Sequence, residues 1–438
     1  MTTSKADTQH SLTREQKEAV GLLSIGTFLE YFDLMLYVHM AVLLNELFFP
    51  KYDPFTASLL SAFAFCSTYL LRPFGALIFG YIGDNIGRKH TLVITTFMMS
   101  FSGIIMANLP TYDQIGISAA WIITICRVIQ GMSSMGEVTG AELYLSEMIK
   151  PSKRYACVSL MCVFATLGAM IALAVASCVT SFGLNWRIAF WFGAGIAFVG
   201  AVARTSLRET AEFVNAQKRM QTILKKTKIN LDQQKQNLLV LQEKVKHKTT
   251  LSYFLIECTG PVWFCITYLY CSNILKENFN FSVEQIIHQN FLVASIEFIV
   301  SVVITKLVLT IHPLKILKIK AIIFAFFALL LPVLLTNVSN NVELIFIQIF
   351  IVVFAPTGFP ASGVFYMHFP SLQRFTCTSM VFAVSRSLMY LITSFGVVIL
   401  TKYFAHWGLL LLILPVIIGH AFGIWYFKNL ELSTENYF

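Results

Sequence analysis

The segment GYIGDNIGRKHTL, residues 80–92, sets three glycines, one acid and two adjacent bases between two long apolar runs. Asp84 and Arg88 are four residues apart, so one helical turn brings their side chains together. The glycines, which are Gly80, Gly83 and Gly87, permit close helix approach and unusual backbone angles. We therefore expect a charged turn between two membrane helices, in which the ion pair latches neighbouring helix ends and releases them when the helices rock.

The composition places this turn in a membrane protein. The 438 residues are 56% hydrophobic and 13% charged, and the mean hydropathy is +0.70. Soluble domains carry about 25% charged residues. The chain is therefore far more apolar than a soluble globular protein, and we expect it to be integral to a membrane.

Apolar segments long enough to cross a hydrocarbon core of about 30 Å recur along the whole chain. Because helices are the open-chain structures that satisfy the backbone in lipid, the predicted fold class is all-α. We expect twelve transmembrane helices, at about 19–44, 55–79, 91–108, 115–148, 156–178, 188–203, 251–275, 286–309, 316–335, 342–365, 375–400 and 409–425.

A long polar, basic stretch divides these helices into two groups of six. The predicted domains are an N-terminal tail (1–18), a six-helix bundle (19–205), a basic linker (206–250), a second six-helix bundle (251–427) and a C-terminal tail (428–438). The linker is interpreted as a solvated helix or as a regulatory element that lies on the bundle or on anionic headgroups. We expect the first helix to be retained, because its apolar run is too long for a signal peptide and has no small-residue cleavage site.

Basic residues indicate the orientation. Of the 32 lysines and arginines, four fall in predicted outer loops (Lys51, Arg187, Lys276, Lys402) and three within helices (Arg72, Arg127, Arg386), and the others fall in inner segments. This asymmetry predicts that both termini are cytoplasmic. It also accounts for the net charge of +9 without a nucleic-acid partner. The cysteines and histidines lack ligand spacing, so no metal is expected.

Two predicted helices carry charged groups at helical spacing. The first has Glu30 and Asp33 on one face, with Tyr37 one turn further on. The fourth has a stripe that contains Arg127, Gln130, Ser134 and Glu137. An ionisable group within a membrane helix is a functional candidate, because its burial is costly unless it is paired or hydrated. We expect both stripes to face a central cavity.

The chemistry of these groups suits an ion-coupled carrier of a small anionic or zwitterionic solute. Arg127 can hold a carboxylate with two hydrogen bonds. A buried carboxylate such as Glu30, Asp33 or Glu137 can load and release a proton. The structural alternative is that Arg127 forms an internal salt bridge with an acid of the first helix and only holds the half together.

The chain resembles the major facilitator superfamily. The loop signature G-x-x-x-D-x-x-G-R-K is complete as Gly80, Asp84, Gly87, Arg88 and Lys89. Further segments resemble its branch of metabolite:proton symporters, which includes proline/betaine carriers: FLEYFDLMLY (28–37), LLRPFGALIFG (70–80), RVIQGMSSMGEVTGAELYLSE (127–147), NWRIAFWFGAG (185–195) and LRETAEF (207–213). The resemblance implies two six-helix halves around a central site, alternating access, and a cytoplasmic gate in which Asp84 and Arg88 join Glu147 and Arg154.

The C-terminal half resembles the family less closely. The segment 306–320, KLVLTIHPLKILKIK, is interpreted as a turn that lacks D-x-x-G-R, and His368 stands where the family often has an acid. Glu257, Glu297 and Arg386 are charges within predicted helices, and we expect Arg386 to pair with one of the two acids. FPSLQR (369–374) lies in a position that is familiar from the family.

The predicted function is proton-coupled uptake of a small zwitterionic osmolyte of the proline or betaine type, by a monomer in the bacterial inner membrane. A dicarboxylate or tricarboxylate symporter, an uncoupled facilitator and a transporter-derived sensor or relic are the alternatives. Only Arg386 provides the extra cationic group that a carboxylate symporter would need in the C-terminal half. No enzyme signature and no cofactor site are apparent.

Overall fold

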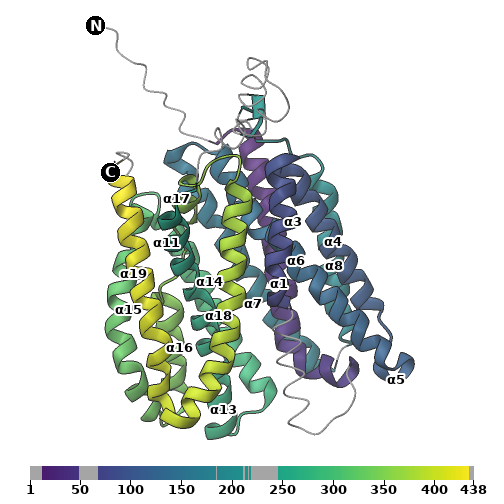
Figure 1. Ribbon diagram of the computed structural model, residues 1–438. Helices are drawn as coiled ribbons and strands as arrows, with labels where there is room; N and C mark the ends of the chain where they lie inside the picture. Colours follow the sequence, from purple (N-terminus) through teal and green to yellow (C-terminus); the bar gives the residue numbers. More distant parts are fainter. Residues whose placement is uncertain are drawn as a thin grey trace.

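The computed structural model describes residues 12–48, 68–183, 185–210, 213–215, 217–218 and 245–433. Within these ranges the chain is helical and forms two bundles that stand side by side, as Figure 1 shows. Nine helical stretches of the described residues are long and apolar enough to cross a membrane, and one of them, Arg374–Ser433, contains two successive helices. This arrangement of membrane-length helices agrees with the all-α fold class expected from the sequence.

The N-terminal bundle contains α1 (Arg14–Phe48), α3 (Arg72–Asn85), α4 (Arg88–Asn108), α5 (Tyr112–Ile115), α6 (Ile117–Met148), α7 (Pro151–Phe182) and α8 (Arg187–Arg204). Helix α1 begins within the predicted tail 1–18. The start of the predicted second helix, 55–67, lies outside the described residues, as do residues 219–244 of the predicted linker.

The C-terminal bundle contains α11 (His247–Glu257), α12 (Thr259–Phe264), a wide helical turn at Cys265–Tyr270, α13 (Cys271–Phe279), α14 (Val283–Leu307), α15 (Pro313–Thr336), α16 (Asn341–Phe354), α17 (Ser362–Met367), α18 (Arg374–Phe404), a short turn at Ala405–Gly408 and α19 (Leu409–Ser433). The predicted tenth helix, 342–365, is wrong as a continuous element, because α16 ends before Pro356 and Pro360. The predicted turn 306–320 is also too long, since α15 already begins at Pro313.

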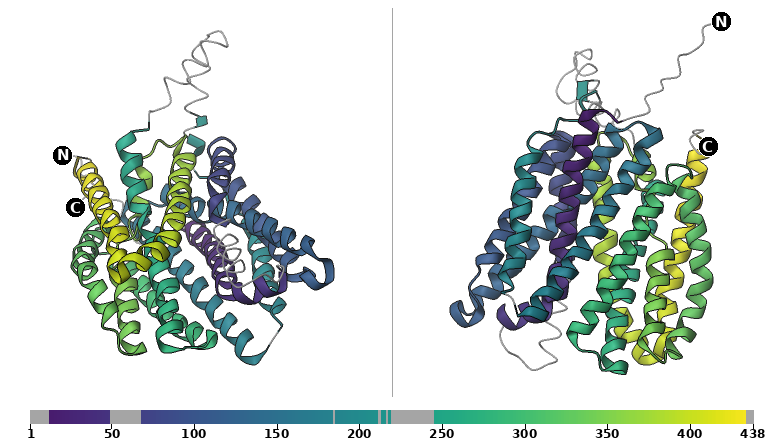
Figure 2. Two further views of the ribbon diagram at one scale, coloured as in Figure 1. Left: turned by 60° about the horizontal axis from the view of Figure 1, so that its bottom comes forward. Right: turned by 180° about the vertical axis from the view of Figure 1, so that it is seen from behind.

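The two bundles contact each other through α3 against α18 and through α7 against α14. The start of α1 and the end of α19 lie at the same end of the molecule, which Figure 2 shows from two further sides. We call this end the terminal side. Large apolar side chains such as Phe74, Phe101 and Phe326 are exposed on the outside of the bundles, as expected for surfaces that face lipid rather than water.

Candidate functional site

A cavity of about 250 Å³ lies between the two bundles. Its wall includes residues of α1, α6 and α7 from the first bundle and of α12, α14, α15, α16 and α18 from the second. The charged residues in this wall are Glu30, Arg72, Glu142, Glu257, Glu297, Lys320 and Arg386. The cavity therefore presents charges of both signs, contributed by both halves of the molecule.

In the N-terminal half, Glu30 is the predicted site residue that reaches the cavity. It is only 3% exposed, and its Oε1 lies 3.9 Å from Arg72 Nη2. The Arg72 guanidinium also stacks on Tyr69, at 4.5 Å from the ring centroid. Arg72 was counted among the helix charges but was given no role; its position within the second-helix motif 70–80, at the start of α3, was the available signal.

The predicted orientation of Arg127 toward the cavity is wrong. Its Nη1 lies 3.3 Å from Asp33 Oδ2 and 3.0 Å from Gln130 Oε1, and its guanidinium covers the ring of Tyr37 at 3.9 Å. None of these four described residues belongs to the cavity wall. The structure thus places Arg127 in the internal salt bridge that the sequence analysis considered as the structural alternative.

Glu137 does not face the cavity either, because a buried arginine of α8 holds it inside the first bundle. Arg204 donates to Glu137 Oε2, and Thr95 donates to Glu137 Oε1 at 2.9 Å. Arg204 also donates to the Leu22 carbonyl at 3.2 Å. Arg204 and Glu137 are each 0% exposed. This pair ties α4, α6 and α8 to α1, and the sequence analysis gave Arg204 no role.

In the C-terminal half, Arg386 lies beside one of the two acids considered for it. Arg386 Nη2 is 3.3 Å from Glu257 Oε2. The second acid, Glu297, accepts a hydrogen bond from the Tyr268 hydroxyl at 2.7 Å. Both acids and Arg386 are part of the cavity wall.

Glu142 connects the two halves at the cavity. The hydroxyl of Tyr366, on α17, donates to Glu142 Oε2, on α6, at 2.6 Å. Glu142 follows Glu137, the last residue of the predicted fourth-helix stripe, by five positions. Because the bond joins helices of different bundles, it depends on the position of α17 relative to α6.

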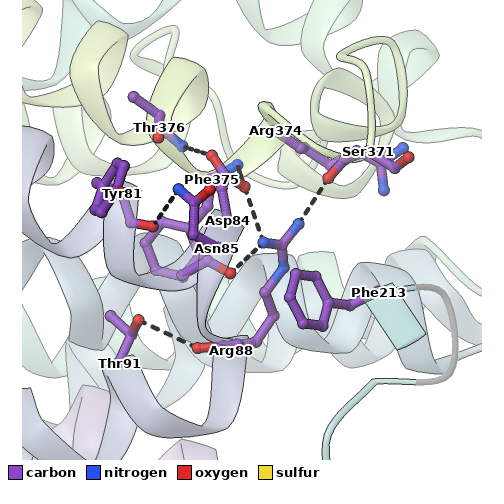
Figure 3. Close-up of polar contacts among 12 residues, drawn as sticks. Tyr81, Asp84, Asn85, Arg88, Thr91, Phe213, Ser371, Arg374, Phe375 and Thr376 are labelled. Atoms are coloured by element: carbon purple, nitrogen blue, oxygen red, sulfur yellow. Dashed lines mark hydrogen bonds and ion pairs between the residues drawn. The ribbon is translucent and has the colours of Figure 1, made fainter. Parts of the chain in front are cut away.

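The charged turn at residues 80–92 forms a network on the terminal side. Arg88 Nη1 lies 2.8 Å from Asp84 Oδ1, and Arg88 Nη2 lies 3.1 Å from Glu147 Oε1. Arg88 Nη2 also donates to the Ser371 carbonyl of the other bundle at 2.8 Å. Figure 3 shows the guanidinium pointing toward Ser371, with the ring of Phe213 beside it. Because its side chain is fully buried, Arg88 joins both halves away from water.

Asp84 also crosses to the second bundle, where it binds the start of α18. Its two carboxylate oxygens accept from the backbone N–H groups of Phe375 at 3.1 Å and Thr376 at 2.8 Å. An acid at a helix N-terminus satisfies otherwise unpaired N–H groups and interacts favourably with the helix dipole. Figure 3 shows the hydrogen bond from the Thr376 N–H group to the Asp84 carboxylate.

The expected place of Arg154 in this network stays a prediction. Arg154 Nε donates to the Ile149 carbonyl at 3.1 Å, and the second arginine on Glu147 is Arg374, at 3.2 Å. Arg374 comes from FPSLQR, so the familiar appearance of that segment was the available signal. We refer to Asp84, Arg88, Glu147 and Arg374 together as the terminal latch.

The glycines of the turn permit these contacts. Gly80 lies so close to α18 that an added Cβ would be 2.7 Å from Thr376 Cα, and Gly83 packs against the ring of Phe375. Gly87 has φ of +143°, which side chains rarely tolerate. The two halves also meet in the cavity wall, where the rings of Tyr69 and Tyr390 are 3.9 Å apart between centroids.

Residues 23–394 match the Major Facilitator Superfamily. The chain belongs to the major facilitator superfamily. Members of this superfamily are membrane transport proteins and not enzymes.

Among curated proteins, a proline/betaine transporter of Escherichia coli is 32% identical over 205 residues, which are 45% of this chain and 41% of that protein. A putative metabolite transport protein of Haemophilus influenzae is 34% identical over 218 residues, 48% of each chain. A putative proline/betaine transporter of Staphylococcus aureus is 34% identical over 211 residues, 46% of this chain and 45% of that protein. The matched segments span about half the length of these relatives.

Solved structures show the same fold over almost the whole chain. The proton:xylose symporter XylE, bound to a bromo-deoxyglucose, superposes with a TM-score of 0.75 at 14% identity and covers 94% of this chain and 95% of that one. The human organic anion transporter MFSD10 gives a TM-score of 0.68 at 13% identity, with 94% of this chain and 100% of that one covered.

Proposed function

We propose that this member of the superfamily is a proton-coupled secondary transporter that takes up a small zwitterionic osmolyte by alternating access. The observation that carries the proposal is the cavity between the bundles, whose described wall contains both acids and bases from both halves. Its volume of about 250 Å³ is below the range of roughly 300–1,000 Å³ for pockets that hold drug-sized ligands. Both properties suit a small solute that carries a carboxylate and a cation.

Further support comes from the relatives and from the wall itself. Two of the relatives are named as proline/betaine transporters or putative ones. The wall also contains aromatic side chains, among them Trp263, Phe264 and Tyr268, and aromatic faces attract quaternary ammonium groups. We propose that the protein acts as a monomer in a bacterial inner membrane, with both termini and the terminal latch on the cytoplasmic side.

Glu30 is proposed as the proton-coupling acid. It faces the cavity, it is buried, and its ion pair with Arg72 is loose at 3.9 Å. A carboxylate in such a place can be neutralised by a proton when the solute or the conformation changes the balance of nearby charge. Asp33, in contrast, is held by Arg127 away from the cavity wall.

A dicarboxylate symporter is the second candidate, and one observation favours it. The sequence analysis expected Arg386 as the sole extra base in the C-terminal half, but Lys320 joins it in the cavity wall, and Arg72 adds a base from the other half. These cations could bind a solute with two carboxylates. The acids in the same wall, including Glu142 and Glu297, favour a zwitterion instead.

The test is uptake of labelled glycine betaine, proline and succinate into proteoliposomes with an imposed pH gradient. We expect accumulation above equilibrium of one of the zwitterions, which disappears when a protonophore collapses the gradient. Glu30→Gln should still exchange solute across the membrane but should no longer accumulate it. Glu18→Gln, an exposed position on the same helix, should behave as the wild type. If the solute only equilibrates across the membrane, whatever the pH gradient, proton coupling is contradicted. If the solute binds but is not taken up, transport is contradicted.

A further inference from the structure

The tenth membrane segment is interrupted where it meets the cavity. Helix α16 ends at Phe354 and α17 begins at Ser362. The connecting residues Ala355, Thr357, Gly358 and Phe359 are part of the cavity wall. Non-helical backbone at membrane depth is tolerated where it is buried in protein or lines a cavity, and broken helices often mark binding sites. The interruption therefore belongs to the binding region.

Lys320 is also part of the cavity wall, and its helix α15 packs against α16. It is the eighth residue of α15, it is 8% exposed, and it shares the cavity wall with Glu297 of α14 and Val352 of α16. Lys320 falls where the predicted turn 306–320 overlaps the predicted helix 316–335, and it was not considered as a site residue. Lys320 lies inside the bundle. Among the described residues, it is the lysine in the cavity wall.

The bases of the wall differ in their partners. Arg72 lies at ion-pair distance from Glu30, and Arg386 lies at ion-pair distance from Glu257. In the described part of the chain, no carboxylate oxygen is within 4.0 Å of the Lys320 ammonium. Glu297, in the same wall, is instead hydrogen-bonded by Tyr268. Burial of an ammonium without an anionic partner is unfavourable in free energy. An anion bound in the cavity beside Lys320 would offset this cost.

We propose that Lys320 binds the carboxylate of the transported solute. The inference rests on the proposed function and adds to it the part of the solute that the C-terminal half recognises. An ammonium is a compact charge with three donors, which can hold a carboxylate in several orientations while the halves move. The cationic end of a zwitterion then lies among the acids and aromatic rings of the same wall, such as Glu142 and Trp263.

A different role for Lys320 is to balance the charge of Glu297 without contacting solute. The two roles predict different behaviour in a double variant. If Lys320 only balances Glu297, then Glu297→Gln together with Lys320→Met restores the wild-type affinity. If Lys320 binds the solute carboxylate, the double variant binds carboxylates as poorly as Lys320→Met alone.

The experiment uses the full chain in proteoliposomes and compares pairs of solutes that differ by one carboxylate. Glycine betaine and choline form one pair, and proline and prolinamide form the other. We expect Lys320→Met to raise the half-maximal concentrations of betaine and proline at least tenfold and to leave the weak competition by choline and prolinamide unchanged. Lys320→Arg should recover part of the affinity. Lys318→Met, an exposed position on the same helix, should have no effect.

Unchanged affinity for betaine and proline in Lys320→Met would overturn the proposal, and so would recovery in the double variant. Thermal unfolding of the purified protein with each solute separates this result from a failure of transport. If no labelled solute is accumulated, but betaine or proline stabilises the wild type and not Lys320→Met, the transport function falls and the role of Lys320 stands. If neither carboxylate shifts the unfolding of the wild type, the role of Lys320 falls.

Discussion

Buried arginines of the N-terminal half have different partners, and the partners distinguish their roles. Arg72 lies in the cavity wall beside Glu30, and Arg88 joins the two bundles. Arg127 and Arg204 pair with acids of their own bundle, away from the cavity wall. A buried ion pair contributes little net stability, but removal of one partner leaves an uncompensated charge that costs about 3–5 kcal/mol. We therefore assign Arg127 and Arg204 to the stability of the first bundle.

Arg204→Met should lower the free energy of unfolding by about 3–5 kcal/mol, because Glu137 is then buried without its cationic partner. Thermal unfolding of the purified protein in detergent measures this loss. Adding Glu137→Gln to Arg204→Met should restore part of the stability. The control is Arg208→Met, which removes a pair with Glu15 whose side chains are 78% and 58% exposed; an exposed pair is worth about 0–1 kcal/mol. Equal effects of Arg204→Met and Arg208→Met would contradict the assignment.

At the scale of the elements, α3 and α18 meet through small groups on the terminal side. The close approach of Gly80 to Thr376 brings the start of α18 within reach of Asp84, which then binds the N–H groups of Phe375 and Thr376. The latch therefore depends on helix packing as well as on charge. A larger residue at position 80 should separate the helices even if every charged group of the latch is retained.

Gly80→Val should open the terminal side, because its Cβ would press on the backbone of Thr376, which cannot rotate away. Distances between spin labels at positions 86 and 373, measured by pulsed electron resonance, report this opening. We expect a population of longer distances that is rare in the wild type. Gly21→Val is the control, since an added Cβ at Gly21 meets nothing within 4 Å. Identical distance distributions in Gly80→Val and the wild type would show that this contact does not hold the halves together.

At the scale of the whole molecule, the sequence predicted what depends on local spacing. The all-α membrane fold followed from composition and segment length, and the contact of Asp84 with Arg88 follows from four-residue spacing within one turn. Contacts between distant segments could not be predicted in this way. Arg374 is 227 residues from Glu147 along the chain, and the helical face of Arg127 did not show that Asp33 would hold it away from the cavity. Lys320 was missed because it was counted with the neighbouring lysines of the inner turn, although it lies within α15 and in the cavity wall.

The cavity wall contains a natural reporter for alternating access, Cys162 on α7. If the terminal latch closes the cavity on the cytoplasmic side, breaking the latch should expose this thiol to that side. Asp84→Asn removes the charge that binds Arg88 and the start of α18. A loss of about 3 kcal/mol from a buried pair changes the ratio of closed to open molecules roughly a hundredfold.

The most direct measurement is the rate at which a membrane-impermeant thiol reagent, applied from the cytoplasmic side, labels Cys162 in a chain whose other cysteines are replaced. The account predicts that Asp84→Asn raises this rate at least tenfold, and that Asp113→Asn, an exposed acid on α5, leaves it unchanged. Equal rates in Asp84→Asn and the parent chain would contradict the claim that this latch controls access to a cavity between the two halves.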